Sequence, residues 1–97
     1  MGKRIVWSDQ ASDDLIDILE YWNKRTGSKT YSLKLYKQIK DLLKVIARFP
    51  AMGQHIDERE EQYFIKDNYM IVYLNESDKI SVMKVWDTRR NPGDFRI

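Results

Sequence analysis

Residues 62–86 read QYFIKDNYMIVYLNESDKISVMKVW. Three runs in this stretch are rich in β-branched and aromatic residues, which is typical of strands. The runs are separated at Asp67 and Asn68 and again at residues 75–78, and both links carry turn-forming residues. Links this short allow only antiparallel pairing. The stretch therefore predicts a three-stranded antiparallel meander with strands at 62–66, 69–74 and 80–86.

Two amphipathic helices precede this meander. In residues 9–26 the apolar side chains recur at helical spacing, and Ser8 or Asp9 can cap the first turn. Gly27 suits a left-handed helix end, and a second helix is expected over about residues 29–48. The short link predicts an antiparallel hairpin. The side chains expected to be buried are Ala11, Leu15, Ile18, Leu19 and Trp22 in the first helix and Tyr31, Leu35, Ile39, Leu42, Leu43 and Ile46 in the second.

The N-terminal residues complete the predicted architecture. Residues 4–7, RIVW, predict a short strand, and residues 51–61 are polar and predict an irregular link. An N-terminal strand, a helix hairpin and a meander together indicate an α+β fold, in which both helices pack on one face of a sheet. A length of 97 residues favours a single domain over residues 1–97.

The composition excludes several classes of protein. Cysteine is absent and His55 is the single histidine, so we expect neither a disulfide framework nor a metal site, and no cofactor. No apolar run approaches the ~20 residues of a membrane span, and the N-terminus becomes acidic too early for a secretion signal. Nothing resembles the nucleophile elbow of a serine hydrolase. We therefore expect a cytoplasmic protein.

Charge is distributed in blocks although the net charge is only +2. Residues 1–23 are mainly acidic, residues 24–48 carry eight cations against Asp41 alone, and residues 57–67 are acidic again. This pattern has three interpretations: a helix solvated by lysines, neighbouring elements of complementary charge, or a basic face with an outside partner. The sequence does not decide among them.

A cationic cluster is predicted where the last strand ends. Arg89 and Arg90 follow that strand, and Lys66 ends the first strand of the meander, so a suitable register would bring the three to one end of the sheet. Such a cluster can bind phosphates, stabilise a phosphorane-like transition state or bind a carboxylate of a partner protein. The alternative is a solvated arginine pair that forms salt bridges with Asp87 or Asp94.

The pattern as a whole resembles a known family. Four segments carry the resemblance: IVWSDQASDDLIDILEYW at 5–22, LKVIARFPAMGQ at 43–54, NYMIVYL at 68–74 and VWDTRRNP at 85–92. In this order and spacing they resemble the RelE/ParE superfamily of bacterial toxins from type II toxin–antitoxin modules, which serve in plasmid stabilisation. The resemblance covers nearly the whole chain. It implies a growth inhibitor that a cognate antitoxin neutralises.

Two activities occur in that superfamily. RelE-like members cleave messenger RNA on the ribosome without a metal, whereas ParE-like members inhibit DNA gyrase. Lys66 matches a lysine of the RelE-like enzymes, and Arg89 or Arg90 matches their arginine after the last strand. However, Met70 stands where these enzymes have a second arginine, and Phe95 stands near the position of their tyrosine. A phenylalanine cannot transfer a proton.

The resemblance therefore favours a ParE-like toxin that binds gyrase. The alternatives are a metal-independent endoribonuclease that acts on the ribosome with mRNA, for which His55 is a further acid or base, and a decayed, non-toxic module that still binds an antitoxin. In each toxic alternative Lys66, Arg89 and Arg90 are the candidate residues for contact with the target. We expect alanine at both Arg89 and Arg90 to leave the unfolding midpoint nearly unchanged and to abolish growth arrest.

Overall fold

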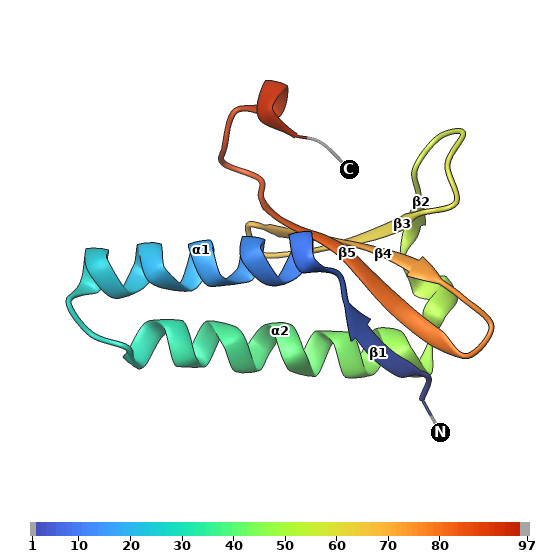
Figure 1. The fold of residues 1–97 in the computed structure, drawn as a ribbon, viewed down its shortest axis with the longest axis horizontal. Helices are drawn as coiled ribbons and strands as arrows, with labels where there is room; N and C mark the ends of the chain where they lie inside the picture. Colours follow the sequence, from blue (N-terminus) through green and yellow to red (C-terminus); the bar gives the residue numbers. More distant parts are fainter. Residues whose placement is uncertain (1, 96–97) are drawn as a thin grey trace.

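The computed structural model describes residues 2–95 and has the predicted order of strand, helix hairpin and meander (Figure 1). One sheet has the spatial order β1-β5-β4-β3-β2, and both helices pack on one face of it. The predicted α+β fold is confirmed. The elements are β1 (Arg4–Trp7), α1 (Asp9–Thr26), α2 (Thr30–Arg48), the short 3-10 helix η1 (Pro50–Met52), β2 (Gln54–His55), β3 (Gln62–Lys66), β4 (Tyr69–Asn75), β5 (Lys79–Asp87) and the 3-10 helix η2 (Pro92–Asp94).

The sheet is larger than the predicted meander because a strand joins it at each edge. β1 lies parallel to β5, and β2 pairs antiparallel with β3. The prediction that residues 51–61 are wholly irregular is wrong, because η1 and β2 fall within or next to them. Buried hydrogen bonds hold this segment on the sheet: the Gly53 N–H donates to the Tyr73 hydroxyl at 2.9 Å, and the Gln62 side chain donates to the Gly53 carbonyl at 3.1 Å. A Cβ at Gly53 would collide with the Tyr73 ring.

The ends of α1 follow the predicted capping rules, whereas α2 begins after Lys29 without a side-chain cap from that residue. Ser8, rather than Asp9, caps α1, because its Oγ accepts a hydrogen bond from the Ala11 N–H at 3.0 Å. Gly27 ends α1 in the left-handed conformation at φ 72°, which a residue without Cβ adopts at little cost. The N–H of Thr30 then donates to Ser28 Oγ at 3.0 Å as the chain enters α2.

The core lies between the helix hairpin and the sheet. The predicted helical stripes contribute to it, and the sheet adds Ile71, Tyr73, Ile80 and Val82, which are inaccessible to solvent. Tyr31 is an exception: it was expected to be buried but is 41% exposed. The closed end of the hairpin extends past the sheet, so no strand covers this turn of α2 (Figure 1). None of the helices within residues 2–95 is long and apolar enough to cross a membrane.

Strand register sets which residues meet at the end of the sheet that bears the arginines. β5 carries one extra residue, Met83, between its pairing to Tyr73 and its pairing to Val72. Beyond this bulge, Tyr69 is opposite Asp87 on one side and opposite Lys66 on the other. The three residues form one row across β3, β4 and β5.

Candidate functional site

The backbone after β5 is held in place. Both the N–H and the hydroxyl of Thr88 donate to the Asn68 carbonyl, at 2.8 and 2.9 Å, so the end of β5 is fixed to the turn between β3 and β4. The N–H of Arg90 donates to the Asp87 carbonyl at 3.0 Å. Arg89 and Arg90 therefore project from an ordered turn.

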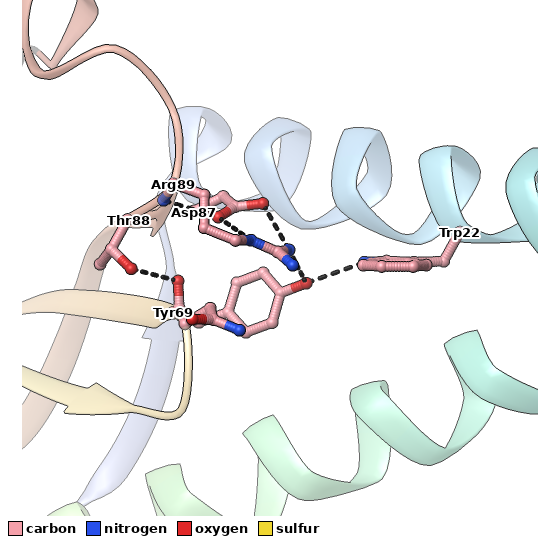
Figure 2. Close-up of polar contacts among 6 residues, drawn as sticks. Trp22, Tyr69, Asp87, Thr88 and Arg89 are labelled. Carbon is pink, nitrogen blue, oxygen red and sulfur yellow. Dashed lines mark hydrogen bonds and ion pairs between the residues drawn. The ribbon is translucent and has the colours of Figure 1, made fainter.

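Arg89 is the centre of a polar cluster between β5, β4 and α1 (Figure 2). Its Nε and Nη2 donate to the two carboxylate oxygens of Asp87, each at 2.9 Å. Nη2 also lies 3.4 Å from the Tyr69 hydroxyl, which accepts a hydrogen bond from Trp22 Nε1 at 2.8 Å. The guanidinium carbon lies 5.5 Å from the ring centre of Trp22 and 5.9 Å from that of Tyr69, within the range of cation–π attraction. These contacts fix the orientation of Arg89.

These contacts also shift the proton affinities of the cluster. The hydrogen bond from Arg89 lowers the pKa of the Asp87 carboxyl below its ordinary value. The same contact raises the pKa of the Arg89 guanidinium further above its ordinary value. Burial raises the pKa of the Tyr69 phenol, an effect that the hydrogen bond from Trp22 partly opposes. At neutral pH the cluster thus holds a permanent ion pair and a protonated phenol, and no group in it is ready to accept a proton.

Unlike Arg89, Arg90 has a guanidinium that is available to contact another molecule. Its guanidinium carbon lies 4.9 Å from the ring centre of Trp86, and the residue is exposed. Within the described part of the chain no carboxylate lies at ion-pair distance from it. Trp86 supports one face of the guanidinium, and the nearby Asp87 carboxylate is already bound by Arg89, so Arg90 can present its donors to another molecule.

A groove of about 600 Å³ lies between α1 and this arginine turn. We call it the arginine groove. Apolar and aromatic side chains of α1 form one wall together with the carboxylate of Asp17, and the arginines and Asp87 form the other. The rings and the arginines of such a groove suit an anchoring side chain whose apolar part packs on the rings while a polar end meets the arginines. Its lining residues are Asp17, Ile18, Tyr21, Trp22, Asp87, Arg89 and Arg90.

Lys66 reaches the same end of the sheet but does not contact the arginines. The row Lys66, Tyr69, Asp87 crosses two strand spacings, so the backbones of Lys66 and Asp87 are roughly 10 Å apart with Tyr69 between them. The side chain of Lys66 lines a narrow hollow beside Leu35 and Leu42 of α2. The expected cluster of three cations is therefore divided: Arg89 and Arg90 share one groove, and Lys66 lies on the other side of Tyr69.

The remaining candidate for proton transfer lies elsewhere. His55 lies on β2 and pairs with Gln62 of β3. Gln62 is four residues, or about 13 Å, along β3 from Lys66. Met70 is opposite Trp86 in the ladder, and the Phe95 ring packs edge-on against Trp86 with centroids 5.3 Å apart. Hence the two positions at which a RelE-like enzyme would need polar groups carry apolar side chains around Trp86. Among residues 2–95, no group of three or more His, Asp or Glu side chains could hold a metal ion.

Two residues of the cluster were not identified as site residues from the sequence. The helical stripe predicts Trp22 in the core of the hairpin, and Tyr69 falls within a predicted strand. Both are largely apolar side chains with one polar atom, and such side chains need a hydrogen-bond partner when they are buried. That requirement was the available signal, but only the tertiary structure shows that the two polar atoms meet at Arg89.

Comparison with known proteins agrees with this architecture. The family model described as "ParE toxin of type II toxin-antitoxin system, parDE" matches residues 5–92. A solved structure titled "Chromosomal ParDE TA system from P. aeruginosa" superposes with a TM-score of 0.72 over 86% of this chain and 92% of that chain, at 14% identity, a likeness of fold. No curated protein sequence matches. Since the family match extends over almost the entire chain, the protein belongs to the ParE toxin family of type II toxin–antitoxin systems.

Proposed function

We propose that this toxin inhibits growth by binding DNA gyrase in the cytoplasm, that Arg90 and the arginine groove contact the target, and that a cognate antitoxin neutralises the protein. The observation that carries the proposal is the difference in how the chain binds the side chains of Arg89 and Arg90. Arg89 is bound by Asp87, Trp22 and Tyr69, whereas Arg90 is supported by Trp86 and has no carboxylate at ion-pair distance among residues 2–95. A fixed surface of this kind is suited to recognition.

The chemistry of the site supports binding over RNA cleavage. Metal-independent cleavage needs groups that give and take protons beside the scissile phosphate. Here the Tyr69 hydroxyl already accepts a hydrogen bond from Trp22, and the Asp87 carboxylate is bound by Arg89. Phe95, near the position of the RelE-like tyrosine, packs on Trp86. The groove therefore offers a target the Arg90 cation, an apolar wall and the carboxylate of Asp17 at its α1 side.

The expected contribution of Arg90 to binding is large. An arginine that becomes desolvated in an interface and meets a carboxylate or carbonyl group typically costs 2 kcal/mol or more when it is truncated, about a thirtyfold loss of affinity. Its planar fork also fixes the orientation of the partner group, which lysine cannot do. Arg89, in contrast, has part of its hydrogen-bonding capacity occupied within the chain.

The test is a gyrase supercoiling assay with purified toxin. The wild-type chain should inhibit supercoiling and accumulate cleaved DNA–gyrase complexes, and Arg90→Ala should require at least about tenfold more protein for the same effect. Arg59→Ala is the matched control, because Arg59 is also an exposed arginine but pairs with Glu61 in the loop before β3. It should behave as wild type.

Other outcomes would assign the protein differently. Unchanged supercoiling at excess toxin, combined with new cuts in translated messages by primer extension, would replace gyrase with the ribosome as the target. Vigorous growth on expression without antitoxin would indicate a module that has lost toxicity. Equal loss of potency in Arg90→Ala and Arg59→Ala would remove the arginine groove from target recognition while leaving gyrase as the target.

A further inference from the structure

The outward face of α2 carries a row of four cations, with one carboxylate, Asp41, among them. Lys37, Lys40, Lys44 and Arg48 follow one another at spacings of three and four residues, which places them on one face of a helix. All four are exposed, and they lie opposite the face that α2 buries through Leu35, Ile39, Leu43 and Ile46. We call these four cations the α2 basic stripe. At 1.5 Å per residue, the stripe extends about 16 Å from Lys37 to Arg48.

Asp41 alone offsets part of the charge of this stripe among the described residues. Lys37 pairs with Asp41 at 2.8 Å within α2, and this hydrogen bond lowers the pKa of the Asp41 carboxyl. For Lys40, Lys44 and Arg48, no carboxylate among the described residues is within ion-pair distance, and no ion pair there joins α1 to α2. The charge blocks of the sequence are thus not explained by pairing between the two helices. Of the three interpretations, a solvated helix and an outside partner remain.

We infer that the α2 basic stripe binds the phosphate backbone of duplex DNA. The argument is charge complementarity. Duplex DNA carries one negative charge per about 1.7 Å of its axis, so the roughly 12 Å from Lys40 to Arg48 would face about seven phosphates, more than enough for three unpaired cations. Lysines are depleted from protein–protein interfaces, whereas protein–DNA interfaces are strongly positive. A row of lysines therefore fits DNA better than an acidic protein.

The stripe is separate from the arginine groove. In Figure 1, α1 lies between α2 and the segment that follows β5, so the two surfaces face different directions. A target protein bound at the groove would leave the stripe free to contact DNA. The inference goes beyond the proposed function, because it concerns DNA alone and does not require gyrase to be the target.

The test is equilibrium binding of the purified chain to a fluorescently labelled duplex of mixed sequence, measured by anisotropy at several salt concentrations. Each neutralised phosphate contributes about 0.9 to the slope of log affinity against log salt. Three cations should therefore weaken binding by about 40-fold when salt rises from about 50 to about 200 mM. In Lys40→Gln/Lys44→Gln the same change should weaken binding by only about fourfold, and affinity at low salt should fall.

The matched control removes the same charge elsewhere. Lys24 and Arg25 are at the closed end of the hairpin, three turns of α2 away from the middle of the stripe. The variant Lys24→Gln/Arg25→Gln should therefore retain the 40-fold salt response. The inference is overturned if the wild-type chain shows no salt-dependent binding, or if the control loses as much as the stripe variant. It is also overturned if Lys40→Gln/Lys44→Gln weakens antitoxin binding while the salt slope for DNA is unchanged. Because this assay contains no gyrase, its result is independent of the supercoiling test.

Discussion

Two ion pairs, one within β5 and one at its end, have different roles. Lys84 and Asp14 of α1 are 3.6 Å apart, with side chains 7% and 14% exposed. Arg89 and Asp87 are 2.9 Å apart, with side chains 46% and 17% exposed. The shorter and geometrically better pair is the more exposed one. Burial, and not distance alone, therefore decides how much each pair matters to folding.

We call the buried pair, Lys84 and Asp14, the inner pair, and the more exposed pair, Arg89 and Asp87, the outer pair. The surroundings of the two pairs explain their different roles. Asp14 faces Lys84 and also accepts a hydrogen bond from the Val85 N–H at 3.1 Å. Lys84 Nζ lies 5.4 Å from the ring centre of Trp86. If one partner is removed, the other remains a charge with little access to water, which costs several kcal/mol. At the outer pair, water can replace either partner. The inner pair thus fastens α1 to β5, while the outer pair orients Arg89.

The largest effect is expected for Asp14→Ala. It should lower the free energy of unfolding by about 3 kcal/mol, because Lys84 loses its counterion and the Val85 N–H loses its acceptor. Denaturant unfolding followed by circular dichroism measures this. Asp13→Ala removes the neighbouring exposed carboxylate and should change the value by less than about 0.5 kcal/mol. Similar losses in both variants would refute a special role for the inner pair.

A second substitution divides that loss into its causes. Lys84→Met in the Asp14→Ala background removes the unpaired buried cation and keeps a flexible apolar side chain of similar length. About 2 kcal/mol should be recovered, and the remainder reflects the lost hydrogen bond to Val85. If the double variant is no more stable than Asp14→Ala, the hydrogen bond and not the charge accounts for the loss.

The outer pair should contribute less. Arg89→Ala should lower the free energy of unfolding by about 1 kcal/mol, since it removes one half-exposed ion pair and the contacts with Trp22 and Tyr69. Arg89→Lys keeps the charge without the planar fork and should lose most of the same amount. A loss above about 3 kcal/mol would place this pair in the same class as Lys84 and Asp14.

The outer pair also predicts a pH dependence. Arg89 lowers the folded-state pKa of Asp87, so the stabilisation is fully present above the ordinary aspartate pKa and is lost as pH falls through the lowered folded-state value. The gap of about 1 kcal/mol in unfolding free energy between wild type and Arg89→Ala should therefore shrink below about pH 4. In an Asp87→Asn background the same gap should not change with pH over this range. A gap that widens on acidification would contradict the assignment.

Arg90→Ala should have the smallest effect on stability. Its contact with Trp86 is exposed, so the free energy of unfolding should stay within about 0.5 kcal/mol of wild type while growth arrest is lost. Paired measurements of unfolding and growth on this variant check both parts. A stable variant that still arrests growth would reject Arg90 as a target contact. Since Arg89→Ala alone is expected to cost about 1 kcal/mol, the double alanine variant should lose about as much, which is more than the nearly unchanged midpoint expected from the sequence.

Much of the fold was predictable because local signals agreed with one another. The Ser8 side chain caps the start of α1, and Gly27, which lacks a Cβ, adopts the left-handed conformation at its end. Asp67 and Asn68 form the turn that the sequence indicates. The edges of the sheet were not predictable in this way. β2 exists because Gly53 can approach Tyr73, which lies twenty residues away, and no local pattern encodes such a contact.

Some features of the candidate site were likewise predictable from the sequence, and others were not. The sequence by itself determined that two arginines follow the last strand, that polar residues are missing at Met70 and Phe95, and that α2 carries a row of cations, because each follows from residue type and spacing along one element. The pairs of Arg89 with Asp87 and of Lys37 with Asp41 are also local, two and four residues apart. Among residues 2–95, Arg90, Lys40, Lys44 and Arg48 have no carboxylate at ion-pair distance. Only the tertiary structure brought Asp14 of α1 to Lys84 and the Tyr69 hydroxyl to Arg89, because charges and dipoles interact through space at a few ångströms while these partners are far apart in the sequence.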